Sequence, residues 1–222
     1  MKLKLEIRLE EKNDCRKVEE LIRESFWNLY IPGATEHLIV HSLRNSKVFV
    51  PELNFVAIKD GKLVGQIFYT KAKIIDINKK YHDILTFGPI SVASEFRNLG
   101  IGKALIEHSK KIANELGYKG IIIYGYPDYY NKIGFQSAAK YGISREDGVF
   151  AKALLAMELY PNSLEGLSGR FHEYVSAFEI NEEELSKFDS SFPEKEKKYE
   201  QSQDLFMKMT DQLEEPENIK SE

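Results

Sequence analysis

Residues 87–107 have the sequence FGPISVASEFRNLGIGKALIE, in which three local patterns follow one another. Ile84–Val92 is rich in apolar and β-branched residues, which predicts a buried strand. Beyond Gly100, apolar residues recur at helical spacing as far as Leu116, and Gly117 can end that helix in the left-handed conformation. A short loop at residues 93–99 therefore joins a strand to a helix.

This junction has the properties of an anion site. The first turn of a helix has about four N–H groups without helical partners, and the helix dipole adds positive potential there. Gly100 and Gly102 have no Cβ that would keep a phosphate away from those donors. Arg97 and Lys103 place positive charge on either side of the glycines. We therefore expect a phosphate or pyrophosphate to bind here.

Two common phosphate motifs do not match the loop. The mononucleotide motif G-x-x-x-x-G-K-[ST] fails at Arg97 and at Ala104, and the dinucleotide motif G-x-G-x-x-G fails at Leu105. The pattern that is present is Arg97-x-x-Gly100-x-Gly102, directly after a strand. Its alternative interpretation is an ordinary strand-to-helix turn capped by glycine.

Composition limits the classes of partner. The chain has 222 residues, of which 42% are hydrophobic, and a net charge of −4, so we expect a globular protein and no nucleic-acid partner. Cys15 is the only cysteine, which excludes an intrachain disulfide and a cysteine metal cluster. No apolar run reaches the ~18 residues of a membrane span, so we expect no membrane partner and a cytoplasmic location.

The remaining segments predict an α/β protein, more narrowly an α+β fold with a mixed sheet. Strands are expected at 2–9, 53–58, 63–77, 84–92, 120–124, 135–143 and 151–159, and helices at 15–29, 35–44, 101–116 and 128–133. Asp60-Gly61 predicts a hairpin turn and Gly65 a bulge. A right-handed crossover through the helix after Gly100 places the strand at 120–124 parallel to the strand at 84–92.

The composition changes in the last quarter of the chain. Residues 163–169 resemble a loop, 171–178 a strand, and 181–211 a helical or extended segment on the surface, and we expect the last ten or so residues to be disordered. We divide the chain into a domain at 1–160 and a C-terminal extension at 161–222. The extension can cover a substrate site, contact a second copy of the chain or form a solvated tail.

A second motif gives the first one a family context. Residues 125–135 have the sequence GYPDYYNKIGF, which contains Tyr130-x-x-x-Gly134-Phe135 after the apolar strand at 120–124. Together the two motifs resemble the GNAT superfamily of N-acetyltransferases, in a branch of predicted small-substrate enzymes. The resemblance extends over about residues 2–159 and implies a GNAT-type acyl-CoA N-acyltransferase fold with a C-terminal extension. Tyr126 replaces an acid that relatives often carry.

The resemblance implies acetyl-CoA as co-substrate, no metal, and N-acetylation of a small-molecule or peptide amine by direct attack on the thioester. The loop is implied to hold the CoA pyrophosphate, and backbone N–H groups of the preceding strand are implied to bind the thioester oxygen. The implied cofactor-binding residues are Ile90, Ser91, Val92, Arg97, Asn98, Leu99, Gly100, Ile101, Gly102 and Lys103. Tyr130 is implied to protonate the leaving thiolate, and we expect Tyr129 to be a packing residue.

The general base is left open by the sequence. The candidates are Glu36, His41, Glu52 and Asp83, each of which can equally be a solvated surface charge. His37 and His41 have the spacing of metal ligands on a helix, but no third ligand is spaced to join them, so we expect no metal site. The rival function is a non-catalytic acyl-CoA-binding sensor or regulatory module. The acceptor, and whether the chain is a monomer or a homodimer, are also open.

Overall fold

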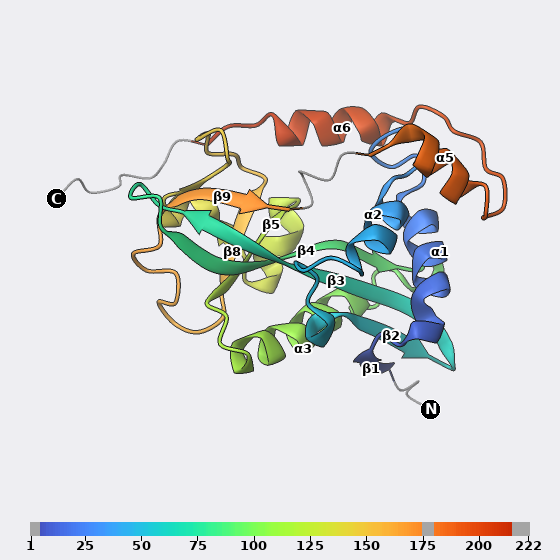
Figure 1. Ribbon diagram of the computed structural model, residues 1–222, viewed down its shortest axis with the longest axis horizontal. Coiled ribbons are helices and arrows are strands. Elements are labelled where there is room, and N and C mark those ends of the chain that lie inside the picture. Colours follow the sequence, from blue (N-terminus) through green and yellow to red (C-terminus); the bar gives the residue numbers. More distant parts are fainter. Residues whose placement is uncertain (1–4, 175–179, 215–222) are drawn as a thin grey trace. The chain divides into compact units, whose positions relative to one another are not determined.

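The computed structural model describes residues 5–174 and 180–214 (Figure 1), and the chain forms two compact units. The first unit contains the described parts of residues 1–69, 88–109 and 175–204, and the second those of 70–87, 110–174 and 205–222. Four elements contribute to both units, namely β3 (Lys62–Ile75), β4 (Tyr81–Val92), α3 (Ile101–Glu115) and α6 (Gln201–Thr210).

The strands of the first unit follow the predicted hairpin. β1 (Leu5–Leu9) is antiparallel to β2 (Phe55–Lys59), which pairs with the beginning of β3. Asp60 and Gly61 both have positive φ, 53° and 75°, as a two-residue hairpin turn requires. Ala57 of β2 lies opposite Gly65 of β3, but Ile58 lies opposite Leu63, so the register shifts at this point. The bulge predicted at Gly65 is therefore confirmed.

Two helices cover an apolar cluster in the same unit. α1 (Cys15–Phe26) and α2 (Glu36–Leu43) lie side by side (Figure 1). The buried members of the cluster are Val18, Ile22, Val40, Leu43, Val56 and Phe68. Asp14 precedes α1 but does not cap it, because its carboxylate accepts hydrogen bonds from Arg8 and from the backbone N–H of Glu11.

The strand, loop and helix around Gly100 are confirmed. β4 ends at Val92, a single 3-10 turn occupies Ser94–Phe96, and α3 begins at Ile101. A Cβ on Gly65 would lie 3.0 Å from Cγ2 of Ile101, so this glycine allows β3 to approach the start of α3 closely. The helix that follows the loop at residues 93–99 is thereby held against the sheet.

The second unit contains the rest of the sheet. Leu85 of β4 lies opposite Ile121 of β5 (Gly120–Tyr124) in a parallel pair, as the crossover rule predicts. β5 is antiparallel to β8 (Leu154–Glu158), which also pairs with β6 (Gln136–Ser137). β9 (Gly169–Glu173) is antiparallel to the end of β3 and parallel to β7 (Ile143–Ser144). The prediction of a mixed sheet is confirmed.

One predicted strand, at 135–143, is wrong. β6 lasts for two residues, and a 3-10 helix at Ala138–Tyr141 separates it from β7. The Ser137 hydroxyl accepts a hydrogen bond from the backbone N–H of Ala139 at 3.2 Å, and Gly142 ends the turn with a φ of 68°. A side chain that binds its own backbone competes with the sheet ladder and ends the strand early. The short helix predicted at 128–133 is present as α4 (Pro127–Tyr130) and a 3-10 turn at Asn131–Ile133.

The C-terminal segment begins with α5 (Glu182–Asp189) in the first unit and continues into α6. The guanidinium of Arg23, which is 2% exposed, lies 2.6 Å from the carboxylate of Asp189 and ties α5 to α1. Of the strand predicted at 171–178, residues 171–173 belong to β9 and 175–178 lie outside the described residues, as do residues 215–222, where disorder is predicted. Within the described ranges, no helix has the length and apolar character needed to cross a membrane.

Candidate active site

The loop between β4 and α3 has the backbone conformation of an anion site. Asn98 and Gly100 have positive φ values of 62° and 79°, and residues 97–100 are exposed. The N–H of Ala104 donates to the carbonyl of Gly100 at 2.9 Å, which is the first bond of the helical pattern. The N–H groups of residues 101–103 precede that bond, so the helix itself supplies no acceptor for them. A Cβ built on Gly100 would meet no atom within 4 Å, so the space beside the loop is open.

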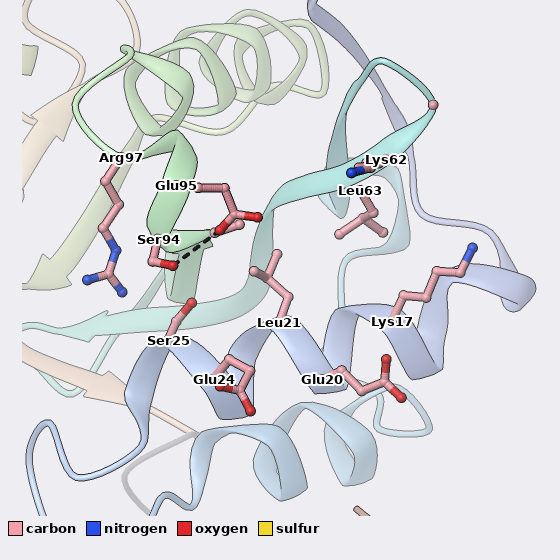
Figure 2. A pocket seen from close by; sticks show the side chains of 12 residues that line it. Lys17, Glu20, Leu21, Glu24, Ser25, Lys62, Leu63, Ser94, Glu95 and Arg97 are labelled. Carbon is pink, nitrogen blue, oxygen red and sulfur yellow. Dashed lines mark hydrogen bonds between the residues drawn. The ribbon is translucent and has the colours of Figure 1, made fainter. Parts of the chain in front are cut away.

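Arg97 connects this loop to a neighbouring cavity. Its Nε donates to the carbonyl of Val92 at 3.4 Å, which keeps the side chain near the end of β4. The cavity has a volume of about 570 Å³ and is formed by α1, the β2–β3 turn and residues 93–97. Figure 2 shows the guanidinium of Arg97 extending toward the Ser25 end of α1.

The cavity walls carry both signs of charge. The charged side chains are Lys17, Glu20, Glu24, Lys62, Glu95 and Arg97, three of each sign. Figure 2 also shows the hydroxyl of Ser94 hydrogen-bonded to Glu95, over 3.2 Å. This cavity is therefore not a simple phosphate pocket, and the anion-binding features belong to the loop and the start of α3.

A buried amide fixes the end of β4. Gln66 on β3 is 1% exposed, and its Nε2 donates to the carbonyl of Pro89 and to the hydroxyl of Ser91, both at 3.2 Å. Ser91 is buried, whereas Ile90 and Val92 are half-buried. Sequence reasoning missed Gln66, although a polar residue within the apolar run of β3 was a visible signal. Its bonds position the backbone on which thioester binding is expected.

Tyr130 belongs to the second unit, where aromatic side chains surround its ring. The ring centroid lies 6.1 Å from that of Phe87, 5.4 Å from that of Phe135 and 5.0 Å from that of Tyr129. A Cβ on Gly125 would lie 2.4 Å from Cε2 of Tyr130, so the ring rests on this glycine. Tyr129, for which a packing role is expected, packs its ring edge-on against that of Tyr130 and is 47% exposed.

Gly134 and Phe135, at the end of the second motif, both have a structural role beside Tyr130. Gly134 has a φ of 102° and follows the short helix in the left-handed conformation. The N–H of Phe135 donates to the carbonyl of Tyr130 at 3.2 Å, and the Phe135 side chain is buried. The motif therefore fixes both the backbone of Tyr130 and one wall of its aromatic surroundings.

The four candidate bases lie in different surroundings. His41 Nδ1 is 2.9 Å from the carboxylate of Glu19. Glu36 accepts the backbone N–H of Thr35 at 3.0 Å, and burial raises the pKa of its carboxyl. Glu52 and Asp83 are exposed.

The two histidines of α2 contact residues of α5. His37 is fully buried, Nε2 lies 3.2 Å from Asp189, and burial lowers its pKa to about 4. The ring of His41 lies 4.5 Å from that of Phe188 on α5, tilted by 42°. Among the residues described, no cluster of three or more histidine, cysteine, aspartate or glutamate side chains is arranged to hold a metal ion.

Comparison with known proteins places both motifs in one domain. The family model for the acetyltransferase (GNAT) domain matches residues 51–137, which contain the loop before α3 and the tyrosine motif. The uncharacterized N-acetyltransferase YhbS of Escherichia coli K12 is 25% identical over 175 residues, which are 78% of this chain and 99% of YhbS. The uncharacterized N-acetyltransferase YjhQ of the same strain is 26% identical over 130 residues, 58% of this chain and 68% of YjhQ.

Two solved structures share the fold. The crystal structure of the GNAT family N-acetyltransferase YhbS from Escherichia coli in complex with CoA has a TM-score of 0.69 at 23% identity, and the match covers 81% of this chain and 96% of that one. A GNAT family acetyltransferase from Brucella melitensis in complex with acetyl-CoA has a TM-score of 0.62 at 21% identity, with 77% and 96% covered.

Proposed function

We propose that this chain is an N-acetyltransferase of the GNAT superfamily, which transfers the acetyl group of acetyl-CoA to a primary amine of a small molecule or a peptide. The observation that carries the proposal is the exposed loop at residues 97–100 with the start of α3, where backbone donors and two cations meet. The two similar structures that contain CoA or acetyl-CoA support the choice of co-substrate.

The loop suits the pyrophosphate of acetyl-CoA. The N–H groups of residues 101–103 supply donors, and the positive φ at Asn98 and Gly100 keeps the turn open on that side. Arg97 and Lys103 are exposed and add positive charge. A Cβ on Gly100 would meet no atom within 4 Å, so the loop leaves open space for the phosphates beside this glycine.

The reaction begins with an acceptor that has to lose a proton. An alkyl ammonium has a pKa of about 10.4, so at neutral pH a base must free its lone pair. The neutral amine attacks the thioester carbonyl carbon, and backbone N–H groups near Ile90 and Val92 stabilise the oxyanion. Gln66 positions this part of β4 through its bonds to Pro89 and Ser91. Tyr130 then protonates the departing CoA thiolate.

The test is an assay of CoA thiol release with acetyl-CoA and a panel of polyamines, amino acids, peptides and other primary amines. The proposal predicts release with at least one class of acceptor, together with a product heavier by one acetyl group in mass spectrometry. Thiol release without acetylated product would indicate hydrolysis. Tight acetyl-CoA binding without release on any acceptor would contradict the proposal and favour the sensor function.

A further inference from the structure

β9 places an acidic side chain at the end of β5. Phe171 and Glu173 are two residues apart on this strand, so they share a face. The ring of Phe171 lies 6.1 Å from the ring of Tyr124, the last residue of β5. Glu173 is half-buried and lies opposite the fully buried Ala72 of β3. Its carboxyl is thus partly removed from water beside the carboxyl end of β5.

The surroundings of Glu173 raise the pKa of its carboxyl toward neutral pH. Burial raises the pKa of the Glu173 carboxyl to about 7, while the charge of His172 lowers it and that of Glu146 raises it. Burial and then the charge of Glu173 raise the pKa of Tyr124 to about 12. The other charged groups here form two pairs, His172 with Glu146 at 2.9 Å and Arg145 with Asp147 at 2.6 Å.

The same end of β5 carries the tyrosine of the second motif. Tyr124 is followed by Gly125, on which the ring of Tyr130 rests. Within the second unit, a carboxyl group that can exchange a proton near neutral pH and the expected acid therefore flank the same short segment. Acid and base catalysis both require such groups close to one reacting centre.

We propose that Glu173 is the general base of the acetyltransferase, taking a proton from the acceptor ammonium directly or through one water molecule. This inference rests on the proposed function and adds a fifth candidate to the four that the sequence offered. A side chain on β9 is outside the segment that the GNAT domain model matches, which ends at residue 137.

The proton balance of the step is complete. Glu173 removes one proton from the ammonium, and the freed lone pair forms the C–N bond to the carbonyl carbon. Collapse of the oxyanion breaks the C–S bond, and the thiolate takes a proton from Tyr130. The nitrogen gives its second proton back to Tyr130, and Glu173 releases its proton to water. The products are the neutral amide, the CoA thiol and one proton.

The experiment compares kcat/KM of the wild type and Glu173→Gln between pH 5.5 and 9 on an acceptor that the wild type acetylates. The wild-type rate should rise as the carboxyl ionises and level off above pH 7, because the ionised Glu173 then takes the proton from the ammonium form of the acceptor. Glu173→Gln has no base at this position and reacts only with the small free-amine fraction, so its rate should keep rising about tenfold per pH unit toward the acceptor's own pKa. The wild type should therefore exceed the variant by about 10²- to 10⁴-fold near pH 7, and this ratio should shrink as the pH rises toward 9.

Two control variants make the result specific. Glu146→Gln removes a neighbouring carboxylate and should keep the wild-type rate within about threefold, because Glu146 pairs with His172 at the surface. Glu36→Gln removes the other candidate with a raised pKa, and it should also retain the wild-type pH profile. The acetyl-CoA dissociation constant should be the same in all three variants and the wild type.

Thermal unfolding shows whether the variant is folded and whether Glu173 titrates as described. The pKa of this carboxyl is higher in the folded state than its ordinary value of 4.5. The free energy of unfolding of the wild type therefore decreases as the pH rises from 4.5 toward 7. The melting temperature of Glu173→Gln relative to wild type should therefore increase between pH 5 and pH 8. Full activity in folded Glu173→Gln, or loss of the profile in Glu36→Gln alone, would overturn the assignment of Glu173. Absence of turnover in the wild type would instead remove the proposed function itself.

Discussion

Arg97 shows how far one residue can be interpreted from sequence. Its place three positions before Gly100 predicted an anion site, and the structure gives an exposed guanidinium tied to the carbonyl of Val92. Its role toward acetyl-CoA stays a prediction. A hydrogen bond to a charged group contributes about 1.5–3 kcal/mol, which corresponds to roughly 10- to 150-fold in affinity.

Arg97→Ala should therefore weaken acetyl-CoA binding at least about tenfold in calorimetric titration at low salt, with a smaller effect at high salt. Lys17→Ala is the matched control, because Lys17 is a cation that lines the same cavity from α1. It should change the dissociation constant less than about twofold. Equal effects of the two variants would indicate a general field of positive charge rather than a contact at Arg97.

The second residue-scale prediction concerns Tyr130. Tyr130→Phe keeps the ring among Phe87, Tyr129 and Phe135, so the fold and acetyl-CoA affinity should be unchanged. Loss of a general acid lowers kcat by about 10²- to 10⁴-fold. Steady-state kinetics check this, and an unaltered kcat would show that Tyr130 only packs.

The positions of residues that depend on strand pairing between distant parts of the sequence could not be predicted. Glu173 reaches the end of β5 because β9 pairs with β3 across about a hundred positions of sequence, and the base candidates drawn from local pattern did not include it. Gln66 was visible as a polar residue in a strand, but only the structure shows that it binds Pro89 and Ser91. Local pattern identifies residue types, whereas tertiary pairing decides which of them meet.

At the scale of elements, periodicity predicted the longer segments well. The hairpin at Asp60-Gly61, the strand before the loop and the helix α3 all depend on local signals of several residues. The strand predicted at 135–143 failed because the Ser137 hydroxyl and Gly142 form a turn within it. A short apolar run alone does not distinguish a strand from such a turn.

Gly125 links one element to the proposed acid. Gly125→Ala would place a methyl group 2.4 Å from the present position of Cε2 of Tyr130, so the ring has to move. If Tyr130 acts as the acid, kcat should fall by about tenfold or more, since a displacement near 1 Å can cost that much. Gly61→Ala, at a turn glycine with no atom near the built Cβ, is a control for stability loss alone. An unchanged kcat in Gly125→Ala would contradict a catalytic position for this ring.

The docking of α5 on α1 depends on one ion pair. Burial alone would raise the pKa of Asp189, but its hydrogen bond and charge interaction with Arg23 outweigh that effect and lower it. Asp189→Asn leaves Arg23 with a buried charge and should cost about 3 kcal/mol of unfolding free energy at pH 7. The loss should shrink as the pH falls through the lowered pKa, because the wild-type carboxyl is then protonated.

Urea denaturation of wild type and variant between pH 2.5 and pH 7 measures this effect. Glu20→Gln removes a partner of Arg16 from an exposed pair on α1 and should cost less than about 1 kcal/mol. Equal costs for the two variants would show that Asp189 is no more important than a surface charge.

At the scale of the whole molecule, the order of elements was predictable from the spacing of apolar residues and the crossover rule. The resemblance to the GNAT superfamily is confirmed by the family model that matches residues 51–137. The role of the C-terminal segment was not predictable, because the contacts of α5 with α1 link positions more than 160 residues apart. The division at residue 160, the choice between monomer and homodimer, and the cytoplasmic location stay predictions.

The most direct measurement is calorimetric titration of acetyl-CoA into the wild type and into Gly102→Glu. A glutamate in the first turn of α3 is compatible with the helix dipole, so the variant should fold, but its carboxylate occupies the place expected for the pyrophosphate. We predict micromolar binding to the wild type and a loss of at least about thirtyfold in the variant. Equal binding to both proteins, or no binding to the wild type, would contradict an acetyl-CoA site at this loop.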